Sequence, residues 1–255
     1  MFVLKHLWAG LFGGVLMVAI AVSNAIWNDA WPVARYDVLL VLAVVVQGLF
    51  LLFRLESREE VLALVGFSIL GLGMEIYNTA AGNWTYPEEG VFAVAHVPLF
   101  VGAMYSAVGV CVLRMIRIFE MSFVPFPPKW AGVALGIAIY INFFTQHFLY
   151  DIRIVLFVLL IVLFWRTRIE FTPFKGRRWS MPMLASLFFS ALGVWLAENL
   201  GTITGTWAYD GQSQYEWVSL ATLGSWALFL YVALMVALAA LPGATRRSHI
   251  PRPTA

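Results

Sequence analysis

The sequence predicts an all-α, polytopic membrane protein: a transmembrane bundle of about eight helices with a 4+4 parallel internal repeat. Of its 255 residues, 62% are hydrophobic and only 12% are charged, and the mean hydropathy is +0.84. One soluble core cannot bury that much apolar surface. The chain also contains eight long apolar segments, and one motif occurs twice, 123 positions apart. We expect residues 1–255 to form a single integral membrane domain.

The apolar segments have lengths near the ~20 residues that cross ~30 Å of hydrocarbon as a helix. The sixth is short and follows the fifth closely, so these two are expected to form a tight helical hairpin. Ser23-Asn24-Ala25 resembles a signal cleavage site, but the first apolar stretch is longer than a signal core, so we expect it to be retained. In chain order the segments are 7–26, 37–53, 61–81, 91–116, 130–149, 152–166, 181–201 and 217–241.

Basic residues set the orientation, because cytoplasmic loops carry an excess of Lys and Arg. With the N-terminus in the cytoplasm, 14 of the 16 basic residues fall on the cytoplasmic side, and only Arg35 and Arg153 lie opposite. This predicts a multi-pass protein with both termini cytoplasmic. A net charge of +2 without a long basic run excludes nucleic acid as a partner. The single cysteine, Cys111, excludes an internal disulfide.

The repeated motif is Glu-x6-Gly-x-Trp-x-Tyr. It begins at Glu75 in MEIYNTAAGNWTY and at Glu198 in AENLGTITGTWAY. A carboxylate inside a bilayer is costly, so one that lies there points to function. Two at matching positions predict a site at a repeat interface, with halves of approximately 1–123 and 124–246. Both halves begin on the same side, so the axis that relates them would run along the membrane normal.

Other polar residues are expected at the same depth, in the outer half of the membrane. The third segment would carry Asn78 one turn after Glu75, and the fourth would carry His96 early in its helix. We expect the acid–base or ligating groups to be Glu75, Glu198, His96, His147 and Asp151. We expect the substrate-binding groups to be Asn78, Trp84, Tyr86, Asn142, Trp207 and Tyr209. All of them would line one cavity.

Simpler interpretations stay open for each group. The two glutamates could be protonated or could form polar contacts that hold the halves together. His96 alone could be a packed or hydrogen-bonded side chain. His147 and Asp151 could be solvated at the interface, and the Trp and Tyr residues match an aromatic belt.

Four stretches carry a resemblance to a known family: EIYNTAAGNWTYPEEGVFAVAHVPLF (75–100), NFFTQHFLYD (142–151), RRWSMP (177–182) and the second Glu motif. Over roughly residues 65–240 the chain resembles the YoaT-like family of bacterial inner-membrane proteins of unknown function. That resemblance implies a location in the bacterial inner membrane. The Gly-x-Trp-x-Tyr pattern before a Val-Pro is also similar to membrane carotenoid (lycopene) cyclases and carotenoid hydratases. The cyclase pattern differs, because here Pro87-Glu88-Glu89 lies about ten residues before the expected helix start.

These observations lead to one favoured function and three alternatives. The favoured function is a membrane-embedded enzyme that acts by acid–base chemistry on a lipid or isoprenoid, with Glu75 and Glu198 as acid and base. A metal-dependent hydrolase, a small-solute transporter and a structural subunit of a membrane complex are the alternatives. The expected partners are membrane lipid and a hydrophobic small molecule. The sequence identifies neither a cofactor nor a metal.

Overall fold

The computed structural model of the protein describes residues 1–28, 30–146, 148–174, 177–213 and 215–245. Within them the chain is mostly helical, with nine α-helices, one 3₁₀ turn and seven short strands. The chain divides into two compact units. We call Gly10–Val110 with Val194–Leu220 the Glu-motif unit, and Met1–Ala9, Cys111–Gly193 and the described part of Ala221–Ala255 the sheet unit.

Five helices are long and apolar enough to cross a membrane: α3 (Arg35–Leu52), α4 (Arg58–Ala80), α5 (Phe100–Ile118), α8 (Met183–Ile203) and α9 (Leu220–Ala240). The pair α1 (Phe2–Ala9) and α2 (Leu11–Ile26) would make a sixth span, although it bends by 66° at its break. The remaining apolar helices, α6 (Lys129–Thr145) and α7 (Arg153–Phe164), have 17 and 12 residues. A multi-pass helical membrane protein is therefore confirmed, whereas the count of eight spans and the 4+4 division stay predictions.

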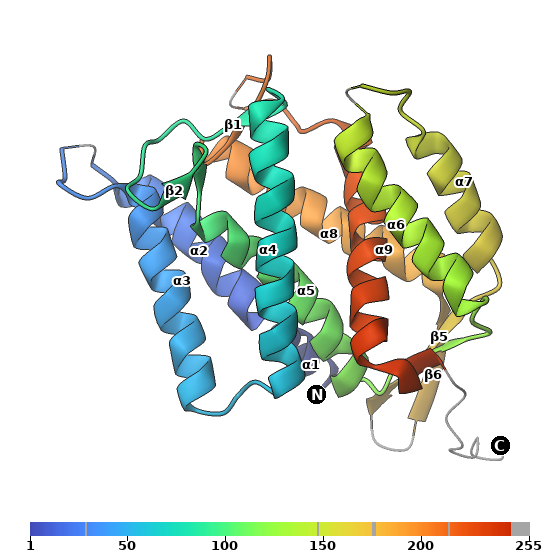
Figure 1. The fold of residues 1–255 in the computed structure, drawn as a ribbon. Coiled ribbons are helices and arrows are strands. Elements are labelled where there is room, and N and C mark those ends of the chain that lie inside the picture. The colour runs from blue at the N-terminus through green and yellow to red at the C-terminus, as the bar shows by residue number, and fades with distance from the viewer. Residues whose placement is uncertain (29, 147, 175–176, 214, 246–255) are drawn as a thin grey trace. The chain divides into compact units, whose positions relative to one another are not determined.

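The Glu-motif unit contains α2, α3 and α4, the first half of α5 and the last turns of α8 (Figure 1). Part of its core lies where α2, α3 and α5 meet, and it contains Phe12, Leu16, Ala43, Phe50 and Ala107. Glycines let α4 and α5 approach closely. A methyl group on Gly71 would lie 2.3 Å from Cγ of Tyr105, and one on Gly109 would lie 2.0 Å from Cδ2 of Phe67. Small residues of this kind are typical of helix contacts in membranes.

Helix α4 begins at a complete capping box. The hydroxyl of Ser57 accepts a hydrogen bond from the backbone N–H of Glu60, and the carboxylate of Glu60 accepts one from the backbone N–H of Ser57. This arrangement satisfies two of the orphan donors at the start of the helix. It fixes where the span that carries Glu75 begins.

Two pairs of two-residue strands join the loops of the Glu-motif unit. Strand β1 (Trp84–Thr85) pairs antiparallel with β7 (Ala208–Tyr209), and β2 (Ala93–Val94) pairs with β3 (Val97–Pro98) in a hairpin. The hairpin corrects the expected helical segment 91–116, because α5 begins only at Phe100. Ala95 and His96 both have positive φ, as a two-residue hairpin turn requires. Pro98 further favours an extended residue before it.

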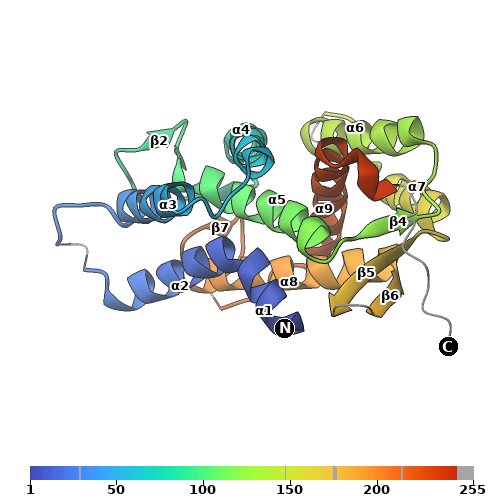
Figure 2. The same cartoon turned by 90° about the horizontal axis from the view of Figure 1, so that it is seen from below.

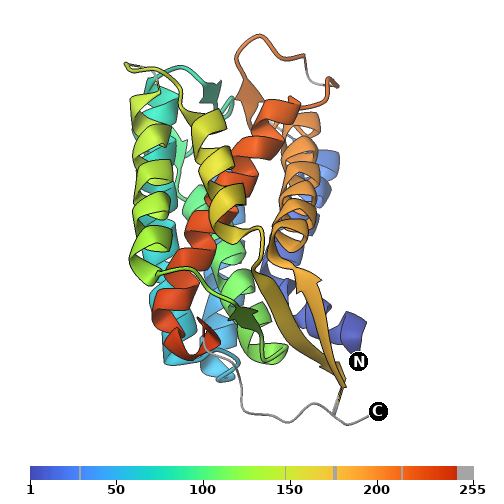
Figure 3. The same ribbon diagram turned by 90° about the vertical axis from the view of Figure 1, so that its right-hand side faces the viewer.

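The sheet unit contains α1, the end of α5, α6, α7, the start of α8, and α9 with the 3₁₀ turn η1 (Pro242–Thr245) (Figure 3). An antiparallel sheet of order β4-β5-β6 joins these helices; it is formed by Ser122–Val124, Arg168–Phe174 and Arg177–Pro182 (Figure 2). Helices α6 and α7 form the hairpin that their short connection predicts. The sheet was not predicted, so the all-α class is correct only as a mostly helical fold.

Candidate functional site

The two Glu motifs end their helices in the same way. Helix α4 ends at Ala80 and α8 ends at Ile203, again 123 residues apart. At each end a glycine with positive φ, Gly82 or Gly205, directs the chain out of the helix. The backbone N–H of Gly82 donates to the carbonyl of Thr79, and the backbone N–H of Asn83 donates to the carbonyl of Asn78. In the second motif the backbone N–H of Gly205 donates to the carbonyl of Thr202, and that of Thr206 donates to the carbonyl of Gly201. This is the Schellman arrangement, and it explains the glycine in both motifs.

Each chain reversal returns a tryptophan and a tyrosine to the carboxylate of its own motif. The indole Nε1 of Trp84 donates to Oε2 of Glu75 over 2.6 Å, and the hydroxyl of Tyr86 donates to the same oxygen over 2.7 Å. In the second motif Trp207 and Tyr209 donate to Oε1 of Glu198 over 2.7 and 2.8 Å. Both carboxyl groups are buried, with exposed fractions of 4% and 8% for Glu75 and Glu198. The spacing of Glu, Trp and Tyr thus encodes a carboxylate with two ring donors.

The two motifs also contact one another. Strands β1 and β7 bring Trp84 opposite Tyr209, and the centroids of these two rings lie 5.8 Å apart. Burial raises the pKa of the Tyr86 hydroxyl well above its ordinary value, and the negative charges of Glu75 and, more weakly, Glu198 raise it further. The pairing of β1 with β7 and the contact of the Trp84 and Tyr209 rings join the two motifs in a single cluster. At neutral pH Tyr86 is a neutral hydrogen-bond donor.

A third donor, Tyr105 on α5, completes the surroundings of Glu75. Its hydroxyl donates to Oε1 of Glu75 over 2.5 Å, and its ring lies against Gly71. Tyr105 lies outside both motifs, so their spacing does not predict it. Its counterpart at the repeat offset is Leu228, which has no polar group. In the sequence, the glycine at position 71, one turn before Glu75, was the feature that could have indicated a large side chain packed against this face of α4.

Asn78 supports the cluster without bonding to the carboxylates. It is buried, its Nδ2 donates to the carbonyl of Met74 over 2.8 Å, and its Oδ1 accepts from Nδ2 of Asn83 over 2.7 Å. These bonds tie the end of α4 to the residue just before Trp84. Asn78 therefore fixes the turn that positions the ring donors.

Three further predicted site residues, His96, Asn142 and Asp151, have local contacts that the structure describes. His96 is exposed in the β2–β3 turn, so the expectation that it lies inside a helix is wrong. Asn142 and Asp151 belong to the sheet unit, where Nδ2 of Asn142 donates to Oδ1 of Asp151 over 3.3 Å. Arg153 donates to the other oxygen of Asp151 over 2.7 Å, and this bond lowers the pKa of that carboxyl. These contacts fasten the connection between α6 and α7. His147 lies outside the described residues.

In the part of the chain that the structure describes, three or more His, Cys, Asp or Glu side chains nowhere meet in an arrangement that could hold a metal ion. The Glu cluster offers carboxylate oxygens surrounded by N–H and O–H donors, which compete with a metal for the same lone pairs. The contacts of the cluster are hydrogen bonds from ring N–H and O–H groups to carboxylate oxygens.

Comparison with known proteins gives a family match and a fold match. The family described as "Protein of unknown function (DUF817)" matches residues 1–234. The chain is 35% identical over 227 residues to the "Uncharacterized protein YoaT" of Bacillus subtilis (strain 168), covering 89% of this chain and 85% of that protein. These matches bear out the resemblance to the YoaT-like family. They do not show the resemblance to carotenoid cyclases.

Among solved structures the chain is similar to the mycobacterial Insig homolog MvINS from Mycobacterium vanbaalenii, with a TM-score of 0.52 and 14% sequence identity. The match covers 76% of this chain and 98% of that one. A cross-linked MvINS trimer gives the same values. At this identity the likeness concerns the fold alone, which is that of a helical membrane protein.

Proposed function

This chain belongs to the DUF817 family, and from that premise and the geometry of the Glu motifs we propose that it is a membrane-embedded enzyme acting by acid–base chemistry on a lipid or isoprenoid. The observation that carries the proposal is that two buried carboxylates, Glu75 and Glu198, each accept from a phenol of their own motif, and that the two motifs contact one another. Carboxylates at such positions in membrane proteins are usually functional.

The hydrogen bonds supply a route for a proton. Tyr105 and Tyr86 donate to opposite oxygens of Glu75, and Tyr209 donates to Glu198. A proton that reaches a carboxylate can be shared with the phenols that donate to it through these short O–H···O contacts. One glutamate would donate a proton to the substrate while the other accepts one. The indoles of Trp84 and Trp207 would hold each carboxylate in place and offer ring faces to an electron-deficient carbon.

Conservative variants of the two glutamates test this function. Glu75→Gln keeps an acceptor oxygen for the ring donors but removes the exchangeable proton. We expect normal folding and a loss of turnover of at least about 100-fold, the usual contribution of an acid or base. The measurement compares the lipid extracts of cells that express the wild type, Glu75→Gln, Glu198→Gln or the exposed control Glu59→Gln. If the wild type and both site variants changed the lipid composition of the cells in the same way, the acid–base role would be refuted.

A structural role of the cluster is the second candidate, favoured by one observation. Glu75 accepts hydrogen bonds from three side chains, so its lone pairs are already well occupied. In that case Glu75→Gln would lower thermal stability and leave the lipid extract unchanged. The same pair of measurements therefore separates a catalytic cluster from a polar lock between helices.

The matched helix ends also support an ancestral duplication, with halves of approximately 1–123 and 124–246 related by an axis along the membrane normal. The support is the offset of 123 residues, which the motifs, the helix ends and the cap hydrogen bonds share. Tyr105 donates to Glu75 in the first half, and the equivalent position of the second half is Leu228, so we infer that the two carboxylates have different tasks.

The orientation in the inner membrane is a separate proposal, with both termini cytoplasmic. It rests on the 14 basic residues that this arrangement places inside. Reporter fusions after Gly90 and after Ala244 are expected to lie on opposite sides, with alkaline phosphatase active after Gly90 only. Activity on the same side for both fusions would contradict the orientation.

A further inference from the structure

A buried arginine lies at the start of α3 with unused donors. Arg35 is 2% exposed. Its Nη2 lies 2.5 Å from Oε1 of Glu88 and 3.5 Å from the hydroxyl of Thr206. Its Nε and Nη1 are buried and have no hydrogen-bond partner within the described chain. Leaving donors of a charged group unsatisfied is unfavourable, so this side chain has the capacity to bind a further acceptor.

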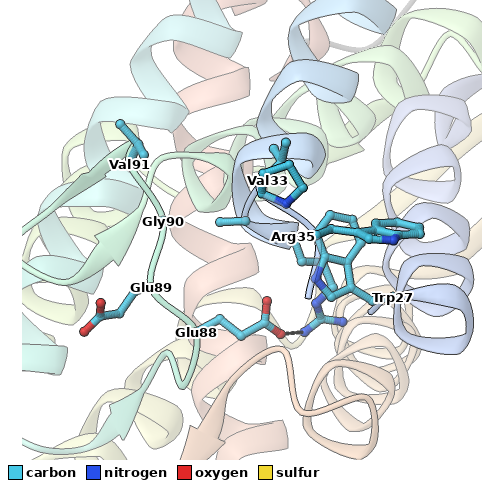
Figure 4. A pocket seen from close by; sticks show the side chains of 10 residues that line it. Trp27, Val33, Arg35, Glu88, Glu89, Gly90 and Val91 are labelled. Atoms are coloured by element: carbon cyan, nitrogen blue, oxygen red, sulfur yellow. Dashed lines mark ion pairs between the residues drawn. The ribbon is translucent and has the colours of Figure 1, made fainter. Parts of the chain in front are cut away.

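Arg35 lies in the wall of a pocket of about 560 Å³ between the α2–α3 connection and the segment that follows β1. In Figure 4 Glu88 points toward Arg35, Trp27 lies beside the guanidinium, and the side chain of Glu89 points away. The pocket belongs wholly to the Glu-motif unit. The size of the pocket fits a polar headgroup. The unused N–H groups of Arg35 are charged donors of the kind that phosphate oxygens accept.

The charges of the pocket select against a simple anion. Glu88 already neutralises Arg35 and has a half-buried carboxylate. A ligand with only negative charge would be repelled by Glu88, and one with only positive charge by Arg35. A zwitterion satisfies both, because its anionic group can accept from one unused donor of Arg35, Nη1 or Nε, while its ammonium group donates to Glu88. The rings of Trp27 and Trp31, 5.0 Å apart, offer further contact to an ammonium group.

The rim of the pocket places this zwitterion at a membrane surface. Trp31, Val33 and Val91 are exposed by 48%, 51% and 85%. The pocket lies beside the loops from which α3 begins and into which α4 ends, and Trp is enriched at this interfacial level of membrane proteins. A ligand here would have its polar part against Arg35 and its apolar part over the exposed rim.

We propose that this pocket binds the headgroup of a zwitterionic phospholipid, a phosphoethanolamine, with its phosphate on Arg35 and its ammonium group on Glu88. The site is independent of the acid–base function, because binding requires no reaction at Glu75 or Glu198. Arg35 and the cluster are nevertheless neighbours: Tyr36 donates to the carbonyl of Thr206 over 2.6 Å, next to Trp207.

Lipid titration of the purified full-length protein in detergent tests the proposal, with bound lipid counted by native mass spectrometry. The probes are phosphatidylethanolamine, phosphatidylglycerol and water-soluble glycerophosphoethanolamine. We expect the wild type to bind phosphatidylethanolamine about tenfold more tightly than phosphatidylglycerol. Glu88→Gln should abolish this preference because it removes the carboxylate that repels an anion and attracts the ammonium group. The matched control Glu89→Gln, one residue away, should retain it.

Arg35→Met provides the second arm, since it should lower the affinity for both lipids. Arg54→Gln, an exposed arginine of the same unit, serves as its control. Should Arg35→Met fail to fold, the comparison of Glu88→Gln with Glu89→Gln still decides the question. Equal affinities of the wild type for the two lipids would overturn the proposal. So would an unchanged preference in Glu88→Gln, or tighter binding of glycerophosphoethanolamine than of the lipid.

Discussion

Gly201→Ala is expected to destabilise the protein by about 2–4 kcal/mol, the combined effect of an overpacked core and a lost hydrogen bond. A methyl group at this position would lie 1.9 Å from Cζ2 and 2.0 Å from Cη2 of Trp207. Trp207 is buried and donates to Glu198, so the indole must leave both its packing site and its acceptor. Thermal unfolding in detergent measures the effect.

Gly193→Ala on the same helix is the matched control. A methyl group there meets no atom within 4 Å, and alanine favours a helix over glycine by about 1 kcal/mol. The two variants should therefore change the unfolding temperature in opposite directions, downward for Gly201→Ala and unchanged or upward for Gly193→Ala. A Gly201→Ala variant as stable as the wild type would mean that Trp207 does not pack against α8 as described.

Glu75→Leu should have the second large effect, a loss of about 2–4 kcal/mol, because it removes the acceptor of one buried donor, Tyr105, and of two partly buried donors, Trp84 and Tyr86. Trp84, Tyr86 and Tyr105 all donate to this carboxylate. The individual bonds are expected to contribute less than in vacuum, since interhelical hydrogen bonds in membranes average about 0.6 kcal/mol. The larger part comes from the donors that stay buried and unpaired. Unfolding by denaturant in mixed micelles, with tryptophan fluorescence as the signal, provides the measurement.

Glu75→Gln and Glu59→Gln calibrate that result. Glu75→Gln retains one acceptor oxygen and should lose less than half as much stability as Glu75→Leu. Glu59 is exposed on α4, and its substitution should change stability by no more than about 0.5 kcal/mol. If Glu75→Leu were as stable as Glu59→Gln, the three ring donors would have other acceptors and the cluster would not depend on Glu75.

The composition of the chain was sufficient to predict a membrane protein of apolar helices, because lipid requires long apolar segments whatever their packing. The sequence also determined the local structure of the Glu motifs. A glycine seven residues after the glutamate allows the Schellman reversal, and the Trp and Tyr that follow can then reach back only to their own helix end. A short spacing leaves the chain few other conformations, so matching spacing gave matching geometry at Glu75 and Glu198.

Only the tertiary structure decided which distant groups meet. Depth in the membrane, which the sequence does indicate, fixes one coordinate of a side chain but not the direction in which its helix faces. His96, Asn142 and Asp151 were expected beside the glutamates on depth alone. The structure has His96 in an exposed hairpin turn rather than in a helix, and it pairs Asn142 with Asp151. Tyr105 and Arg35, whose partners lie 30 and 53 residues away, became visible only once α5 and the loops had packed. Such contacts depend on how several helices pack against one another, and the spacing of residues within one short segment does not determine that packing.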